Sequence, residues 1–160
     1  DSALKFNVLF VCSGNTCRSP MAQGIFRSLV EEKYCEVRSA GTTAMAGLPA
    51  AQNAKIVVRE HGGSIDGHET RPLDRETIDW ADLILVMEYK HYVAVLEMNP
   101  DAVVKTFLLR EYRRRTRYTE VPDPVGQDIK VYRRAAAKMM PVLKTLARGI
   151  EIRFKGGQRR

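Results

Sequence analysis

The run Asn7-Val8-Leu9-Phe10-Val11-Cys12-Ser13-Gly14-Asn15-Thr16-Cys17-Arg18-Ser19-Pro20 determines the architecture expected for this chain. Residues 7–11 are apolar and partly β-branched, which is typical of a strand buried on both faces of a parallel sheet. Ser19 can cap a helix and Pro20 suits the first helical position. The segment therefore predicts a strand, a tight polar loop and a helix.

The loop between this strand and helix predicts an anion-binding site. Gly14 and Asn15 are the loop residues that best tolerate a positive φ. Backbone N–H groups in such a turn point inward, and the helix start adds partial positive charge. Arg18 supplies a two-pronged donor for phosphate oxygens. We expect the phosphate group to be bound by Ser13, Gly14, Asn15, Thr16, Cys17, Arg18 and Ser19.

Cys12 is the candidate nucleophile of this loop. A thiol beside a guanidinium and a helix N-terminus should lose its proton near neutral pH, and a thiolate can attack phosphorus. The Ser19 hydroxyl could donate to the sulfur. A bare Cys-x5-Arg spacing would favour a structural cysteine instead, but the flanking strand, turn and helix signals agree on the catalytic interpretation.

Asp123 is the candidate general acid and base. It lies between Pro122 and Pro124, which restrict its backbone and hold the carboxyl group in place. A fixed carboxyl group could protonate the leaving atom and then activate water. An aspartate between prolines is otherwise an ordinary turn residue, and the Cys12 loop favours the catalytic role.

The signature Cys-x-Gly-Asn-x-Cys-Arg-Ser-Pro resembles the low-molecular-weight protein tyrosine phosphatases. The resemblance continues through residues 39–41, 68–73, 86–87 and 123–124. It implies that Cys12 is the nucleophile, Arg18 the phosphate clamp and Asp123 the general acid and base. It further implies that the loop is held by hydrogen bonds from Asn15, Ser39 and His68.

Thr16 and Val125 are the candidate substrate-selecting residues. Tyrosine-directed members of the family typically have isoleucine at the position of Thr16 and aromatic residues after the Asp-Pro pair. The Thr16 version of the loop resembles the protein arginine phosphatase branch, although that branch usually has threonine at position 13 and often phenylalanine at position 125. Phosphotyrosine and phosphoarginine both stay open as substrates.

Two other functions share this loop. Thioredoxin-coupled arsenate reductases need further cysteines after the third strand, and residues 88–100 contain none. An inactive phosphate- or phosphopeptide-binding module would be expected to lack Cys12 or Asp123. We therefore favour a phosphatase that acts on phosphorylated proteins and binds phosphate-like oxyanions. No metal or organic cofactor is expected, since Arg18 fills the cation role.

Alternating signals predict a single α/β domain over residues 1–160. Its open parallel sheet has about four strands with helices on both faces, and the phosphate loop follows the first, central strand. The strands are expected at 7–11, 36–39, 83–87 and 104–107. The helices are expected at 21–33, 50–61, 74–81, 89–98 and 129–148, with a basic tail at about 150–160.

Composition narrows the partners and the compartment. The chain is 44% hydrophobic, and no apolar run approaches the ~20 residues of a membrane span, so we expect a cytoplasmic protein. Three cysteines do not make a disulfide framework. Cys17 could form a reversible, protective disulfide with Cys12, and Cys35 is expected to be structural.

The net charge of +7 is concentrated in residues 110–117 and in the C-terminal tail. We expect a solvated charged face or steering of anionic phosphorylated substrates. No nucleic-acid partner is expected, because no element for reading bases is evident. The sequence carries no signal for the oligomeric state.

Overall fold

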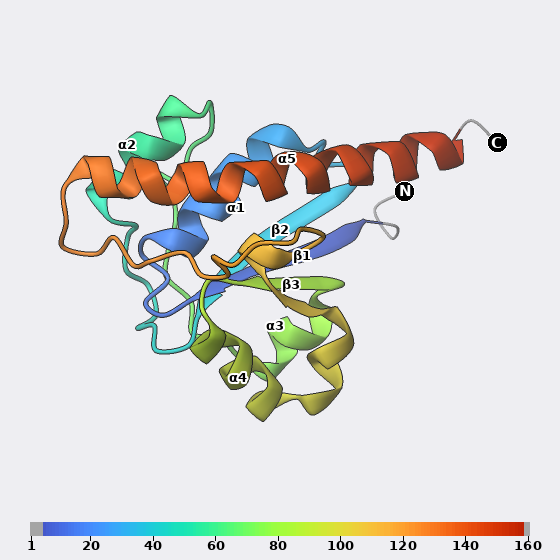
Figure 1. Cartoon of the computed structure of the whole chain (residues 1–160), viewed down its shortest axis with the longest axis horizontal. Helices are drawn as coiled ribbons and strands as arrows, with labels where there is room; N and C mark the ends of the chain where they lie inside the picture. The colour runs from blue at the N-terminus through green and yellow to red at the C-terminus, as the bar shows by residue number, and fades with distance from the viewer. Residues whose placement is uncertain (1–4, 159–160) are drawn as a thin grey trace.

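The computed structural model of the chain describes residues 5–158. A parallel sheet of four strands in the order β2-β1-β3-β4 forms its centre, as predicted (Figure 1). In register, Val8 of β1 lies opposite Val37 of β2 and Leu83 of β3. The strands are β1 (Phe6–Cys12), β2 (Cys35–Gly41), β3 (Leu83–Val86) and β4 (Thr106–Leu108).

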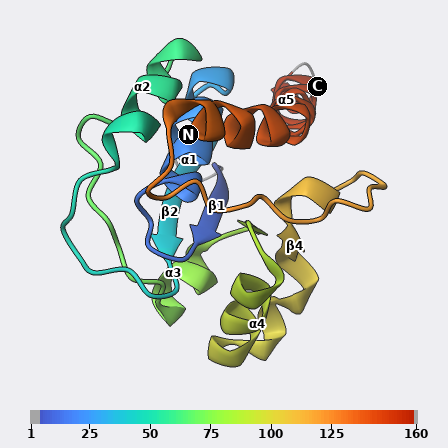
Figure 2. The same ribbon diagram turned by 60° about the vertical axis from the view of Figure 1, so that its left-hand side comes forward.

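Helices cover both faces of this sheet, which confirms the predicted fold class. In two views, α1, α2 and α5 lie on one side of the sheet, whereas α3 and α4 lie on the other (Figures 1 and 2). The helices are α1 (Arg18–Leu29), α2 (Gln52–Glu60), α3 (Arg75–Trp80), α4 (Tyr89–Met98) and α5 (Ile129–Gln158).

β1 has a buried core on each of its faces. Val8 and Phe10 pack in the larger core, with apolar side chains of α1, α2 and α5. Leu9 and Val11 point the opposite way, into a smaller core with residues of α3 and α4. This alternation along the strand explains why the segment is apolar throughout. It also places the end of β1, where the phosphate loop begins, inside the molecule.

The predicted start of the first helix is wrong in one respect. Cys17, not Ser19, occupies the N-cap, and α1 begins at Arg18. Ser19 is therefore already helical, and its hydroxyl is turned toward the Cys12 sulfur instead of capping a backbone N–H group. The helix ends at Leu29, earlier than the predicted residue 33.

The structure around the fourth strand also differs from the prediction. Residues Pro100–Lys105 form the 3-10 helix η2, capped by the Asn99 side chain, so the fourth strand begins at Thr106 instead of residue 104. A second 3-10 turn, η3, follows at Leu109–Glu111.

The C-terminal segment is helical and is not a separate tail, so the predicted boundary near residue 148 is wrong. α5 continues to Gln158, and residues 159–160 lie outside the described part of the chain. Buried Ile150 and the contact of Phe154 with Tyr34, whose ring centroids lie 5.7 Å apart, extend the apolar face of the helix past Gly149. Within residues 5–158, no helix is both long and apolar enough to cross a bilayer.

Candidate active site

The phosphate loop joins the end of β1 to the start of α1. Asn15 adopts φ 59°, as its side chain allows, whereas Gly14, the other residue suited to a positive φ, does not adopt one. The loop lies against Gly41 at the end of β2. A Cβ at position 41 would collide with the Ser13 carbonyl oxygen and lie 2.9 Å from the Asn15 nitrogen. Gly41 therefore permits the loop to pack closely on the neighbouring strand.

Asn15 holds the loop in this shape. Its buried Nδ2 donates to Oγ of Ser19 at 2.8 Å and to Oγ of Ser39 at 3.0 Å, while its Oδ1 accepts the Arg71 N–H at 2.9 Å. Ser39 donates in turn to Oε1 of Gln23 on α1 at 2.5 Å. The loop, β2 and α1 are thus joined through one buried amide, and each hydroxyl has a defined direction.

His68 supports the same residue from the other side. Its Nε2 lies 2.8 Å from the Asn15 carbonyl oxygen. Because a carbonyl can only accept, Nε2 carries the proton. Burial lowers the pKa of His68 despite this hydrogen bond, so the neutral ring is favoured. The structure therefore brings Asn15, Ser39 and His68 together around the loop.

The Cys12 thiol is 2% exposed, and its Sγ lies 2.9 Å from Oγ of Ser19. Since Asn15 already donates to this oxygen, the Ser19 hydroxyl proton is free to be donated to sulfur. A hydroxyl donor is a suitable partner for a sulfur anion. The Asn15 amide thus donates to the Ser19 hydroxyl, and the Ser19 hydroxyl can donate to the Cys12 sulfur.

Arg18 is 1% exposed and is held along one edge by the protein. Its Nη1 donates to Oε2 of Glu88 at 2.5 Å and to the Val121 carbonyl at 2.8 Å. Its Nε is buried and has no hydrogen-bond partner; among residues 5–158 it is the one buried polar side-chain atom of this kind. The Nε–Nη2 edge is the fork that binds two oxygens of one phosphate group. An oxyanion would supply the partner that Nε needs.

Glu88 and His91 contact the candidate site, and the sequence interpretation missed both. Burial would raise the pKa of Glu88, but the hydrogen bond and charge of Arg18 outweigh it and lower that pKa. The Glu88 N–H donates to Nδ1 of His91 at 3.1 Å, so Nε2 carries the proton and donates to Oγ of Ser13 at 2.8 Å. Residues 88 and 91 form the reciprocal contacts of a capping box at the start of α4, but Glu-x-x-His departs from the usual Ser/Thr-x-x-Glu/Gln signature, so the sequence does not mark it.

Asp123 faces the clamp. Its Oδ2 lies 3.5 Å from Nη2 of Arg18, its Oδ1 accepts the Val125 N–H at 3.1 Å, and its side chain is 41% exposed. The backbone N–H of Val125 thus orients the Asp123 carboxyl group. One of its oxygens faces the Arg18 guanidinium, and the carboxyl group stays open to solvent. Cys12 and Arg18 lie at the two ends of the phosphate loop, and Asp123 comes from a segment about a hundred residues further along the chain to face Arg18.

The other two cysteines are buried free thiols. Sγ of Cys17 lies 3.3 Å from the Tyr132 hydroxyl on α5 and 3.5 Å from Oγ1 of Thr16. Burial raises the pKa of Cys17 in spite of these bonds. Burial also raises the pKa of Cys35 to about 12, which makes it an unreactive thiol, as expected of a structural residue. The described residues form no cluster of three or more His, Cys, Asp or Glu that could hold a metal.

Comparison with known proteins agrees with this geometry. The family described as Low molecular weight phosphotyrosine protein phosphatase matches residues 7–155, and the chain belongs to this family of hydrolases. The Protein-arginine-phosphatase of Geobacillus stearothermophilus is 38% identical over 151 residues, covering 92% of this chain and 98% of that protein. The low molecular weight protein-tyrosine-phosphatase Etp of Escherichia coli K12 is 38% identical over 122 residues, covering 76% and 79%.

Solved structures give the same result. The YwlE arginine phosphatase from Geobacillus stearothermophilus superimposes with a TM-score of 0.83 at 36% identity, covering 92% of this chain and 94% of that one. The tyrosine phosphatase Wzb from Escherichia coli K30 in complex with sulphate gives 0.80 at 28% identity, covering 90% and 97%.

Proposed function

We propose that this phosphatase hydrolyses phosphoarginine side chains of proteins through a phosphocysteine intermediate. The observation that carries the choice of arginine is the half-buried Thr16 hydroxyl within the phosphate loop. Its oxygen can accept an N–H from a guanidinium, whereas a hydrocarbon side chain there would offer packing only. The arginine phosphatase of Geobacillus, which matches 92% of this chain, supports the same choice.

In the first step, the Cys12 thiolate attacks phosphorus while the loop N–H groups and the Nε–Nη2 edge of Arg18 hold the non-bridging oxygens. The S–P bond forms as the P–N bond breaks. The Asp123 carboxylic acid protonates the departing guanidine nitrogen. The partial exposure of Asp123 allows it to meet a leaving group that enters from solvent.

In the second step, Asp123 is a carboxylate and takes a proton from water. The water oxygen attacks phosphorus, the P–S bond breaks, and inorganic phosphate leaves. The sulfur regains its electron pair and the hydrogen bond from Ser19, which lies 2.9 Å away. Phosphate, sulfate and vanadate should therefore compete with substrate for the loop.

The rim of the site supports arginine over tyrosine. Val125, 58% exposed, follows the Asp-Pro pair and supplies an aliphatic surface. A phosphotyrosine ring would gain most from an aromatic wall at this position, and a guanidinium needs none. Thr16 and Val125 are thus our candidates for substrate selection.

Cytoplasmic location and redox protection are part of the proposal. Three buried thiols suit a reducing compartment. We assign Cys17 the role of resolving thiol. Peroxide oxidises the Cys12 thiolate to a sulfenic acid, which Cys17 then attacks, releasing water and forming a disulfide that thiols can reduce.

The test compares kcat/KM for one peptide carrying phosphoarginine and the same peptide carrying phosphotyrosine, in wild type, Thr16→Ile and Thr16→Ser. We expect wild type to favour phosphoarginine by at least about ten-fold, Thr16→Ser to keep this ratio and Thr16→Ile to lose it. p-Nitrophenyl phosphate hydrolysis controls for loop integrity. A wild-type preference for phosphotyrosine, or an unchanged ratio in Thr16→Ile, would refute the arginine assignment.

A further inference from the structure

The segment between β4 and the Asp123 loop carries a dense positive charge. It projects from the body of the molecule (Figure 2). Among the ion pairs formed by residues 5–158, none includes its arginines. We call this group the arginine segment: Arg110, Arg113, Arg114, Arg115 and Arg117.

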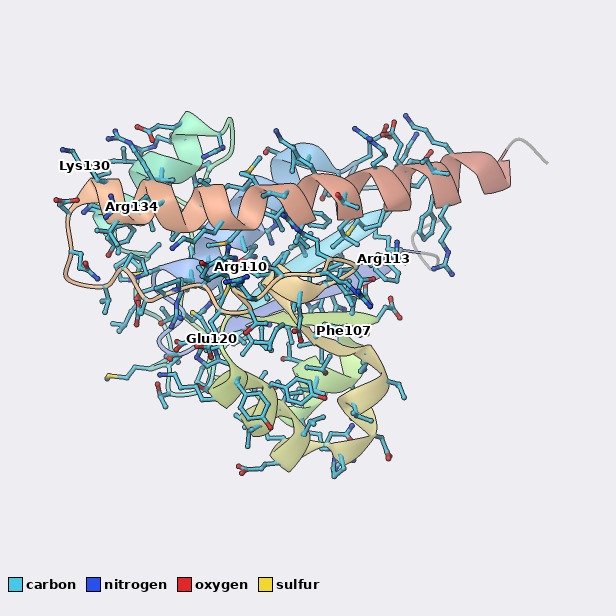
Figure 3. The ribbon with its side chains drawn as sticks, viewed as in Figure 1. Phe107, Arg110, Arg113, Glu120, Lys130 and Arg134 are labelled. Atoms are coloured by element: carbon cyan, nitrogen blue, oxygen red, sulfur yellow. The ribbon has the colours of Figure 1, made fainter. Side chains whose placement is uncertain are left out.

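The base of the arginine segment is joined to the catalytic machinery. Nη1 of Arg110 donates to the Glu120 carbonyl at 3.2 Å, and Nη1 of Arg18 donates to the next carbonyl, that of Val121, at 2.8 Å. Figure 3 shows Arg110 close to Glu120, on the same face of the molecule. From Glu120 to Asp123 is three residues, a span of at most about 11 Å.

We propose that the arginine segment is a docking surface for an acidic stretch of the phosphorylated protein substrate; this inference rests on the proposed function. Exposed guanidinium groups without an ion-pair partner bind carboxylates through paired hydrogen bonds. An extended peptide advances about 3.3 Å per residue, so Asp or Glu about three to six residues from the phosphorylated side chain would reach the segment.

The aromatic residues of the segment favour a peptide over a nucleic acid. Arg113 lies over the Tyr112 ring at 5.4 Å, and Arg110 lies over the Tyr118 ring at 5.7 Å. Tyr112 also contacts Phe107, with ring centroids 5.0 Å apart. Bases stack on open ring faces, and here an arginine lies over one face of each tyrosine, so fewer faces are open to bases. Carboxylates need only the guanidinium groups of the exposed arginines.

The test uses two fluorescent phosphoarginine peptides that differ only in having Glu or Gln at the flanking positions. Arg114→Gln/Arg115→Gln removes two exposed charges of the segment. Lys33→Gln/Lys144→Gln is the matched control, since it removes two exposed charges elsewhere and gives the same net charge. We measure kcat/KM, binding by anisotropy, and hydrolysis of p-nitrophenyl phosphate, which carries no peptide.

We expect the arginine variant to lose about five-fold in kcat/KM and in affinity for the Glu peptide. The Gln peptide and p-nitrophenyl phosphate should be unaffected, and the lysine variant should match wild type. Equal losses in both variants, or no difference between the peptides, would overturn docking. So would loss of single-stranded DNA binding in the arginine variant with unchanged peptide kinetics. If the wild-type protein hydrolysed none of the phosphorylated compounds, the proposed function would be refuted instead. Peptide binding measured by anisotropy would still test docking in that case.

Discussion

Nε2 of His91 lies 2.8 Å from Oγ of Ser13, and Nδ1 of the same ring accepts the Glu88 N–H at 3.1 Å. One neutral imidazole therefore joins the start of α4 to the wall of the phosphate loop. Because Glu88 also binds Arg18, this ring stabilises the position of the loop and of its cation together. Protonation of the ring would remove the acceptor that the Glu88 N–H requires.

This arrangement makes stability depend on pH. Burial, with the charge of Arg18, lowers the pKa of His91 from 6.5 to about 4. Between these values the unfolded chain binds a proton that the folded protein does not, so stability falls as the pH drops from about 6.5 to about 4. The full loss is on the order of 3 kcal/mol. We expect His91→Asn to reduce this loss, measured by urea unfolding at about pH 7 and about pH 4.5. Equal losses in variant and wild type would contradict it.

Replacing Glu88 should separate catalysis from anion binding. Glu88→Gln removes the negative charge that orients Arg18, so we expect kcat to fall about ten-fold. The site also becomes more positive, so inorganic phosphate should inhibit at least as strongly as in wild type. Glu120→Gln is the control, because Glu120 binds the Tyr89 N–H and does not contact Arg18. Weaker phosphate inhibition in Glu88→Gln would argue against this role.

Cys12→Ser should abolish turnover of p-nitrophenyl phosphate, because the hydroxyl is a far weaker nucleophile than the thiolate. The loop N–H groups and Arg18 stay in place, so vanadate binding should persist and can be measured by calorimetry. If the variant turned over p-nitrophenyl phosphate at the wild-type rate, the phosphocysteine mechanism would be ruled out.

Asp123→Asn should slow phosphoenzyme formation according to the leaving group. Phenolate is a poor leaving group without a proton, so phenyl phosphate should lose about 100-fold in kcat/KM. p-Nitrophenolate leaves readily, and its ester should lose much less. Rapid-quench measurement of both esters tests this. If both substrates were slowed equally, Asp123 would not be the acid.

Cys17→Ser should change recovery from oxidation without changing the phosphatase reaction. After brief peroxide treatment, dithiothreitol should restore wild-type activity through reduction of the Cys12–Cys17 disulfide. The variant should lose more activity permanently, because its Cys12 sulfenic acid has no resolving thiol. Mass spectrometry of the treated proteins distinguishes disulfide from sulfonic acid. Identical recovery of the two proteins would remove Cys17 from this role.

The fold could be predicted, and the candidate residues Cys12, Arg18 and Asp123 could be proposed, because their signals are local. Strand, turn and helix signals lie within residues 7–20, and the Asp123 turn is marked by its two prolines. The length of α5 was underestimated because its last turns depend on a tertiary contact, that of Phe154 with Tyr34.

Partners that come from distant elements were not predictable in the same way. Gln23 accepts a hydrogen bond from Ser39, which is sixteen residues away in the sequence. Glu88 binds Arg18, which is seventy residues away. No local pattern encodes such pairs. Ser19 is a different case, since its residue type suits both a helix cap and a donor to sulfur. Only the observed helix start, with Cys17 at the N-cap, decides between them.

Gly41 has a consequence for engineering new specificity. The backbone of the phosphate loop rests directly on this glycine, so even one added methyl group would displace the loop. Redesign of substrate choice must therefore leave the rear of the loop unaltered and work from its open side. Thr16 and Val125 are the positions at which a library of variants can alter the accepted phosphoester or phosphoramidate while the chemistry is retained.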